Sequence, residues 1–287
     1  MAVLSPELRA PEPAPALDAR GALCVVVCVY GAYQNYIPLY VCSVLRSYPD
    51  YFVRVYLHEE LMPHNRRALD AIRQGLSSRF EIRENSFREF PDTAFKTARW
   101  LLPYEELSDF EYAYIGDVDF IICREDPDLR ARHVGYCRAN NLPYSNAVRV
   151  KDPPIKKLSG LHFIIVKPYY EKMKSAMAEM RNRILAEPAG DYARMGNEWV
   201  LYEMVQRGIG RFPPRFFRPV HGIHLGVIRG QLDVDGAAIR RRRPFVIGEL
   251  LRDPVYRLVR RHMDPAILKQ VRHVQALCAG HWWYRFL

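Results

Sequence analysis

Two aspartates separated by one residue stand in an otherwise apolar stretch of the chain. Asp117 and Asp119 lie within Tyr114–Ile122, whose remaining members are mostly aliphatic or aromatic. If the segment stays extended, residues two apart face the same side, so both carboxylates project together. Two like charges beside a core are unfavourable unless a cation or strong donors neutralise them. Because Mg²⁺ and Mn²⁺ favour carboxylate ligands, the segment predicts a divalent-metal site that holds phosphate oxygens; a structural turn is the alternative.

Two histidines among glycines form the second candidate site. His221 and His224 belong to the stretch His-Gly-Ile-His-Leu-Gly, and Arg229 follows shortly after it. Glycines allow a close approach of the backbone to a ligand, and imidazole would complete a metal site begun by the two aspartates. The alternative is one hydrogen-bonded core histidine and one exposed histidine.

The elements that would position these side chains follow from hydrophobic periodicity. Residues 23–29 are a continuous apolar run, typical of a strand buried on both faces. Alternation over 52–57 predicts a second strand, and 79–83 a short third one, with helical spacing between them. This strand-helix-strand-helix-strand order predicts the α/β fold class, with a mostly parallel sheet flanked by helices.

Later segments predict the rest of this layer. Residues 95–102 favour a helix, 111–123 a strand interrupted by the two acids, and 161–166 a further strand. Methionines at helical spacing between 173 and 184 indicate core packing. A helix is expected over 197–207, stopped by glycine.

The end of the first strand is a candidate nucleotide site. In a parallel sheet, ligands bind at the carboxyl edge of the strands, where residues 30–36 should lie. Tyr30 and Tyr33 are candidates to stack on a base, and Asn35 to read its edge. The alternative for each is a place in a tyrosine-rich structural turn.

Charge is distributed unevenly along the chain. The 287 residues carry a formal net charge of +10, with 49% hydrophobic and 26% charged residues, which excludes disordered and fibrous classes. Residues 237–287 hold most of this excess, so the body is nearly neutral and a nucleic-acid partner is disfavoured. The basic, amphipathic tail ends in aromatics and suits an anionic membrane surface; helices packed on the domain with a solvated arginine face are the equal alternative.

Three regions are therefore expected: a disordered, proline-containing leader over 1–20, a catalytic domain over 21–236 and a basic helical C-terminal extension over 237–287. The longest apolar run is far shorter than the roughly 20 residues of a membrane-spanning helix. No secretory signal is recognisable, and the cysteines show no metal-binding or disulfide pattern. We expect a cytoplasmic protein with reduced thiols.

Together these motifs resemble the GT-A glycosyltransferases, particularly the retaining family that includes glycogenin and bacterial galactosyltransferases of lipopolysaccharide. The resemblance covers roughly Leu23 to Arg229 and is carried by short motifs. It implies a Rossmann-like, nucleotide-binding half. It also implies that Asp117, Val118 and Asp119 form a DxD motif at a strand end, with Mn²⁺ or Mg²⁺ on the donor diphosphate.

The resemblance assigns further residues. Lys96 and Arg99 match the basic residues of an upstream helix that contacts the DxD motif and the donor. His224, followed by Leu-Gly, is the first choice for the late metal-binding histidine, and His221 is the second. The Lys-Pro-Trp expected after this histidine is absent, and Arg229 is the candidate for the missing phosphate-facing charge.

The sugar side of the site is also implied by the resemblance. Gly160 and His162 fall in a glycine-containing strand that would line the sugar site. Asn197 and Glu198 open a helix where the family places residues beside the anomeric carbon, in place of the more usual Asp-Gln pair. Glu198 is the candidate base or stabiliser of an oxocarbenium-like centre. Mid-helix Glu203 is interpreted as solvated.

The implied function is a metal-dependent, retaining hexosyltransferase. It would move a sugar from a nucleotide donor, a UDP-sugar being favoured, to a glycan or lipid-linked acceptor in cell-envelope polysaccharide synthesis, at the inner face of the membrane. Three alternatives remain. A haloacid-dehalogenase-like phosphohydrolase would need an Asp-Asp motif that is absent, and a nucleotidyltransferase would need an upstream Gly-Ser signal that is also absent. A nucleic-acid-binding protein would depend on the arginine tail.

Overall fold

Strand β1 (Leu23–Val29) lies at the centre of the main sheet. The computed structural model describes residues 23–90, 94–151, 155–187, 190–212, 222–225 and 244–278. In it β1 pairs in parallel with β2 (Phe52–Leu57) on one side and β4 (Tyr112–Gly116) on the other. β3 (Phe80–Arg83) adds to β2, also in parallel. The predicted α/β class with a mostly parallel sheet is confirmed.

Two antiparallel strands complete this six-stranded sheet, whose order is β3-β2-β1-β4-β9-β6. β9 (His162–Ile165) runs antiparallel to β4 and to β6 (Tyr144–Ser145). The strand predicted over 161–166 is therefore present, but it enters the sheet in the opposite direction to its neighbour β4.

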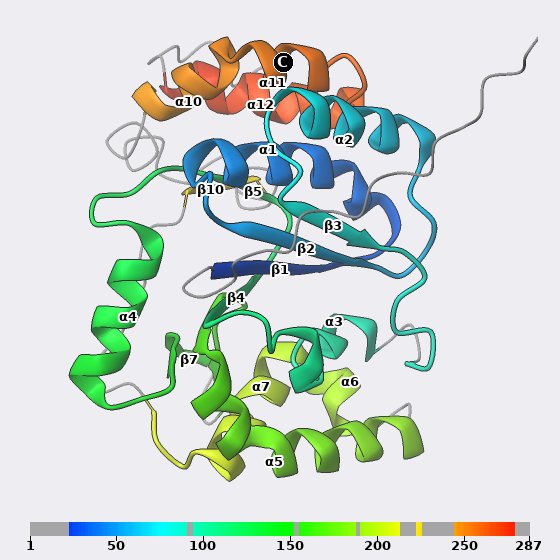
Figure 1. The fold of residues 1–287 in the computed structure, drawn as a ribbon. Helices are drawn as coiled ribbons and strands as arrows, with labels where there is room; N and C mark the ends of the chain where they lie inside the picture. Colours follow the sequence, from blue (N-terminus) through cyan, green and yellow to red (C-terminus); the bar gives the residue numbers. More distant parts are fainter. Residues whose placement is uncertain are drawn as a thin grey trace, which may run out of the picture.

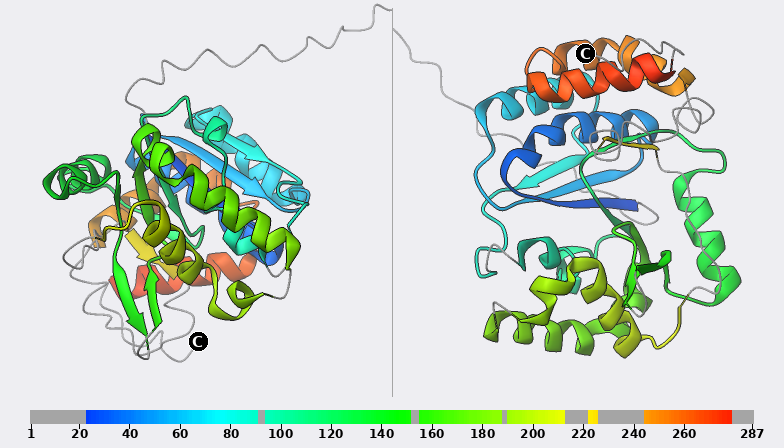
Figure 2. Two further views of the ribbon diagram at one scale, coloured as in Figure 1. Left: turned by 90° about the horizontal axis from the view of Figure 1, so that it is seen from below. Right: turned by 180° about the vertical axis from the view of Figure 1, so that it is seen from behind.

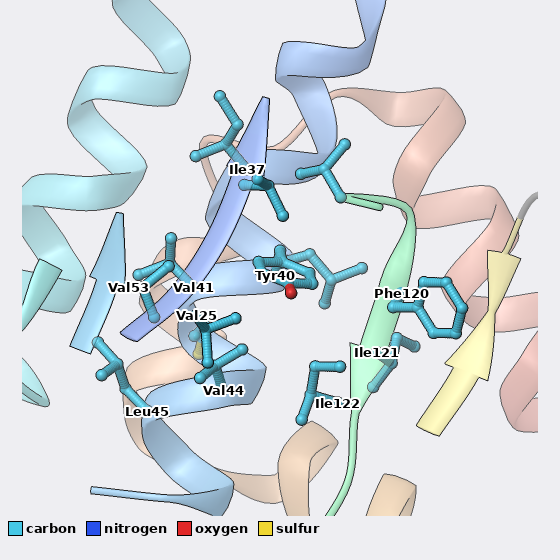
Figure 3. Packing of buried hydrophobic residues seen from close by; sticks show 14 of the residues in the cluster. Val25, Ile37, Tyr40, Val41, Val44, Leu45, Val53, Phe120, Ile121 and Ile122 are labelled. Atoms are coloured by element: carbon cyan, nitrogen blue, oxygen red, sulfur yellow. The ribbon is translucent and has the colours of Figure 1, made fainter. Parts of the chain in front are cut away.

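The alternation of β1 divides the core into two layers. Leu23, Val25 and Val27 belong to one buried cluster, whereas Cys24 and Val26 belong to another. The first cluster includes residues of α1 (Ile37–Ser47) and α2 (Pro63–Gly75), which cover one face of the sheet in Figure 1. Figure 3 shows this packing, with Tyr40 of α1 among the aliphatic side chains. A continuous apolar strand is thus explained by burial on both faces.

The second cluster is covered by a different group of helices. These are α3 (Phe95–Ala98), α5 (Val166–Ala186) and α7 (Asn197–Gly208), on the opposite side of the sheet in Figure 1. The methionine stripe of α5 is buried in this cluster, as predicted. The α3 helix is shorter than the predicted 95–102, because single turns replace it before Pro103, where a helix is disfavoured.

Shorter elements connect these layers. They are η1 (Gly31–Tyr36), η3 (Tyr104–Glu106), β5 (Phe120–Ile122), α4 (Leu129–Asn140), the β7 (Val148–Lys151) and β8 (Ile155–Leu158) hairpin, α6 (Asp191–Met195) and β10 (Gly222–His224). The hairpin and the β5–β10 pair each form a two-stranded sheet outside the main one.

The C-terminal helices pack on the α1–α2 layer. α10 (Pro244–Arg252), α11 (Pro254–Val259) and α12 (Pro265–Cys278) form the outermost layer in Figures 1 and 2. Their buried residues, including Leu250 and Tyr256, belong to the first cluster, with Val25 of β1. The sequence left two interpretations of this segment, a membrane-binding surface or helices packed on the domain. The apolar side chains of the described helices pack on the domain. Within the described part of the chain, none of the helices combines the length and apolar character needed to traverse a bilayer.

Candidate active site

The strand order creates a crevice at the carboxyl end of the sheet. From β1 the chain builds β2 and β3 on one side, and then returns to place β4 on the other side of β1. Connections that leave adjacent parallel strands in opposite directions open a crevice at their carboxyl ends, which is where α/β proteins bind ligands. Tyr30 follows β1 and Asp117 follows β4, so both predicted segments meet at this point.

A cavity of about 390 Å³ occupies this crevice and collects most of the predicted site residues. Those that line it are Tyr30, Tyr33, Lys96, Arg99, Asp117, Val118, Asp119, Asn197, Glu198 and His224. His221 and Arg229 lie outside the described residues.

The Asp-x-Asp segment is a bend rather than a continuous strand. β4 ends at Gly116 and β5 begins at Phe120, so Asp117, Val118 and Asp119 connect two strands of different sheets. The interruption predicted at the two acids is therefore present, and the extended geometry that would put both carboxylates on one face does not apply. The reason is that β5 leaves the main sheet to pair with β10, which turns the chain at the aspartates.

Arg99 neutralises the first of these aspartates. Its Nη1 donates to Asp117 Oδ1 at 2.5 Å and to the Gly116 carbonyl at 3.1 Å, and its Nη2 donates to Asn197 Oδ1 at 3.2 Å. The Arg99 side chain is 8% exposed and that of Asp117 is 36% exposed. The guanidinium also lies over the Trp100 ring, 4.3 Å from its centroid. A fixed arginine therefore supplies the strong donors that a carboxylate pair beside a core requires.

The second aspartate lies beside His224. Strand β10 pairs antiparallel with β5, which brings His224 opposite Phe120 and its Nε2 to 3.7 Å from Asp119 Oδ1. The Leu225 amide donates to the Asp119 carbonyl at 2.8 Å, which fixes this arrangement. Gly222 makes the pairing possible: its φ is +145°, and a Cβ there would lie 1.9 Å from the Ile121 carbonyl oxygen. Only glycine fits so close to the neighbouring strand.

The donor set suits a divalent metal, although its members are not gathered as ligands. Asp117, Asp119 and His224 line the same cavity, but among the described residues no three His, Cys, Asp or Glu side chains converge as a metal cluster. The reason is that Arg99 holds Asp117, while Asp119 and His224 form a separate pair. Carboxylate and imidazole donors nevertheless match the preferences of Mn²⁺ and Mg²⁺. Asp119 and His224 would hold the ion, joined by Asp117.

The opposite wall is the start of helix α7. Gly196, with a φ of +86°, precedes Asn197, which accepts the bond from Arg99. Glu198 Oε1 accepts from the Gly160 amide at 3.0 Å and from Arg149 Nη1 at 3.3 Å. Glu198 thereby ties the helix to the loop between β8 and β9, and its carboxylate is held by two donors.

Gly160 lies against the charged pair, although it is outside the cavity lining. A Cβ at this position would come within 3.0 Å of Asp117 Oδ2 and 3.3 Å of Arg99 Nη2. Because glycine has no side chain, the Arg99–Asp117 ion pair can occupy the space next to residue 160.

Aromatic rings and a lysine form the wall near β1. The rings of Tyr30 and Tyr33 stack with their centroids 6.0 Å apart, and Lys96 Nζ lies 5.4 Å from the Tyr30 centroid. Tyr33 is 39% exposed, so part of its ring surface is open to a ligand. Lys96 is exposed beside it.

The structure places two predicted residues elsewhere. His162 is fully buried, with Asn146 Nδ2 bonded to its Nδ1 at 2.9 Å and Tyr169 Oη to its Nε2 at 3.1 Å. This burial lowers the pKa of His162 to about 3, as expected for a neutral core histidine. Asn35 does not line the cavity either, because its amide bonds to Asp264, His64 and Asn65. The hydrogen-bond partners of His162 and Asn35 could not be predicted from the neighbouring sequence.

Three lining residues were missed by the sequence analysis. Lys157, Cys28 and Gly196 also face the cavity. Lys157 Nζ donates to the Met195 carbonyl at 2.9 Å. Lys157 could have been found in the sequence from its position shortly before Ser159 and Gly160, which were already predicted to line the sugar site. Cys28 could have been found as the residue nearest the carboxyl end of β1 that faces away from the α1 layer.

The charges of the cavity balance without a bound ion. Three cationic side chains, Lys96, Arg99 and Lys157, share the lining with the carboxylates of Asp117, Asp119 and Glu198. A divalent metal would leave a positive excess, which is complementary to the negative charge of a diphosphate.

Comparisons with known proteins give similarities of structure only. No protein-family model and no curated protein sequence matches the chain. Galactosyltransferase LgtC, in complex with donor and acceptor sugar analogues, is 18% identical with a TM-score of 0.37, over 63% of this chain and 70% of that one. The glycosyltransferase GlyE of Streptococcus pneumoniae TIGR4 is 13% identical with a TM-score of 0.42, over 64% of this chain and 43% of that one.

Core-mannan synthase A of Aspergillus fumigatus, in a Mn/GDP form, is 11% identical with a TM-score of 0.31, over 65% of this chain and 55% of that one. What the chain does is inferred below from the residues of its own cavity.

Proposed function

We propose that the protein is a glycosyltransferase that binds a nucleoside-diphosphate sugar in the cavity at the ends of β1 and β4. One observation carries this proposal: the Asp119–His224 pair, at 3.7 Å, adjoins the Arg99–Asp117 pair at the point where the strand order reverses. Metal-binding chemistry at such a point suits a nucleotide whose phosphates reach the ion.

A bound divalent ion would neutralise the charge that develops on the departing nucleoside diphosphate. The chain's own residues would do the rest. Lys96, exposed beside Tyr30, would contact the phosphates, and Tyr33 would offer its ring to the base. Arg99 would keep Asp117 oriented, because it bonds both this carboxylate and Asn197.

The start of α7 would face the transferred sugar. Glu198 accepts from Gly160 and Arg149, so its carboxylate is fixed in position and is suited to stabilising positive charge at an anomeric carbon. Asn197 would add an amide donor to a sugar hydroxyl. We include in the proposal a retaining transfer of a hexose from a UDP-sugar to a glycan or lipid-linked acceptor of the cell envelope.

A cytoplasmic location at an anionic membrane surface is a second part of the proposal. Arg257, Arg260 and Arg261 are exposed next to Leu258, which is 44% exposed, on α11 and the residues after it, and α12 adds the exposed cations Lys269 and Arg272. Cations that surround an apolar side chain suit a bilayer with anionic lipids.

Removing these helices would open the core, so the membrane proposal is tested by charge reversal. Arg257→Glu with Arg261→Glu should abolish sedimentation with phosphatidylserine vesicles. Unchanged sedimentation, or binding to RNA only, would contradict this part.

A panel of nucleotide sugars tests the central proposal. UDP-, GDP-, CMP- and TDP-sugars are titrated into the protein with Mn²⁺ or with EDTA. One donor should bind only when the metal is present, and Asp119→Asn should abolish that binding. The matched control is Asp70→Asn on the surface of α2, where Asp70 pairs with Arg73. Metal-independent binding, or normal binding by the Asp119→Asn variant, would overturn the proposal.

A further inference from the structure

The C-terminal helix α12 is bonded directly to the loop that lines the cavity. Asn35 Nδ2 donates to Asp264 Oδ2 at 3.0 Å, and Tyr36 Oη donates to Gln270 Oε1 at 2.9 Å. Both acceptors lie at the far end of the sequence, more than 200 residues away. The acceptor of the first bond is a carboxylate, a type of acceptor that forms stronger hydrogen bonds than neutral groups do.

The loop so held is η1, which carries the aromatic wall of the cavity. It begins at Gly31, whose φ of +56° permits the chain to turn immediately after β1 and Tyr30. Tyr36 packs its ring against Tyr33 with centroids 5.9 Å apart, and Tyr33 packs against Tyr30. A row of rings therefore runs from Gln270 of α12 to the surface that faces the ligand.

The other polar residues of η1 are held from helix α2 and the residues before it. Gln34 is buried, donates to Glu59 and accepts from the Met62 amide at 2.8 Å. Asn35 Oδ1 lies 2.9 Å from His64 Nε2. The loop η1 is thus held from two sides. Residues 59–65 bond it on one side, and Asp264 and Gln270 bond it on the other.

We propose that Asp264 and Gln270 are positioning residues for the donor: they hold η1 in the conformation in which Tyr30 and Tyr33 receive the nucleotide. This inference rests on the proposed function. Neither residue lines the cavity, so each acts through Asn35 or Tyr36. Preorganising a loop lowers the entropic cost of binding, and its loss appears as weaker affinity.

Asp264 also caps helix α12, and the test must separate these two roles. Its Oδ1 accepts from the Ala266 amide at 2.7 Å, while Oδ2 accepts from Asn35. Asp264→Ser retains an N-cap side chain and removes the second acceptor. Gln270→Leu removes the acceptor for Tyr36, and Gln270→Glu keeps one. Tyr36→Phe deletes the same bond from the other side.

Titration calorimetry in saturating Mn²⁺ measures the Kd of UDP. If the wild type prefers another nucleoside diphosphate, that nucleotide is used instead. Asp264→Ser with Gln270→Leu should raise this Kd about 10-fold, since two partly buried hydrogen bonds to the loop are lost. Mn²⁺ affinity measured alone should not change. Gln270→Glu should restore wild-type affinity, and Gln275→Leu, on the exposed side of α12, should have no effect.

Two outcomes overturn the inference. One is a folded double variant whose Kd stays within twofold of the wild type. The other is a thermodynamic cycle in which Tyr36→Phe and Gln270→Leu weaken binding additively, because residues in contact should be coupled. The single variants and Tyr36→Phe decide the question if the double variant does not fold. A wild type that binds none of the nucleotides would instead overturn the proposed function, and this inference with it.

Discussion

The guanidinium of Arg99 and the carboxylate of Asp117 form an ion pair of 2.5 Å at the end of strand β4. The same guanidinium bonds Asn197 at the start of α7. One buried cation therefore joins the Asp117–Asp119 segment to the helix on the opposite wall of the cavity. It also explains how two aspartates one residue apart are tolerated beside the core.

Replacing Arg99 should destabilise the fold. Arg99→Gln leaves a carboxylate, a carbonyl and an amide without their donor, which costs about 1–3 kcal/mol of unfolding free energy. Urea denaturation measures this change. The control is Arg73→Gln, whose partner Asp70 and own side chain are each 50% exposed, and which should change stability by less than about 0.5 kcal/mol. Equal stability of the two variants would contradict the structural role of Arg99.

Adding a methyl group at Gly160 should disturb the proposed metal site. The new Cβ would lie 3.0 Å from Asp117 Oδ2, so the Arg99–Asp117 pair must shift. We expect Gly160→Ala to weaken Mn²⁺ binding about 10-fold, as for other changes next to metal ligands. Loss of the free-ion Mn²⁺ signal in electron paramagnetic resonance measures the affinity.

Gly135→Ala is the matched control for Gly160→Ala. Gly135 lies in helix α4, and an added Cβ there meets no atom within 4 Å. This variant should bind Mn²⁺ normally and gain roughly 0.5–1 kcal/mol of stability, because alanine favours a helix over glycine. Unaltered Mn²⁺ affinity in both variants would show that the space at Gly160 is not needed.

Stability should fall in acid partly because of His162. Burial lowers the pKa of His162 in the folded protein to about 3, below its ordinary 6.5, so the unfolded chain takes up this proton first. The contribution of neutral His162 is fully present above about pH 6.5 and is lost as the pH falls toward 3, with a slope of up to about 1.4 kcal/mol per pH unit.

Denaturation by urea at pH 7 and pH 5 tests this contribution. His162→Gln should be less stable than the wild type at pH 7 but lose less stability between the two pH values. His262→Gln, in the turn between α11 and α12, is the control and should keep the wild-type dependence. A His162→Gln variant with the wild-type pH dependence would show that another group is responsible.

Cys28 should be unreactive despite lining the cavity. Burial raises the pKa of its thiol to about 12, although the charge of Arg99 opposes this shift. At pH 8 the thiolate fraction is then on the order of 10³-fold below that of an ordinary cysteine, and alkylation by iodoacetamide slows accordingly. Mass spectrometry of the native protein measures the rate at Cys28, with the protein in urea as control. Modification at the rate of a model thiol would contradict this prediction.

Local sequence determined much of the scaffold. The run Leu23–Val29 predicts a strand buried on both faces, and such a strand can occupy only the inside of a covered sheet. The strands and helices that follow within residues 37–83 were identified for the same reason, because each buries one face with a regular period. The acids at 117 and 119 were identified because charge is conspicuous in an apolar segment.

Only the tertiary structure decided which partner each polar residue meets. His162 and Gly160 are two residues apart, yet the pairing of β9 between β4 and β6 buries the first among rings and leaves the second beside Asp117. Asn35 turns to Asp264 rather than to a ligand, across a separation of 229 residues. The period of a sequence specifies which side chains share a face. Which residues cover that face depends on segments that are distant in the chain. The free energy of packing against those segments cannot be inferred from a local sequence pattern.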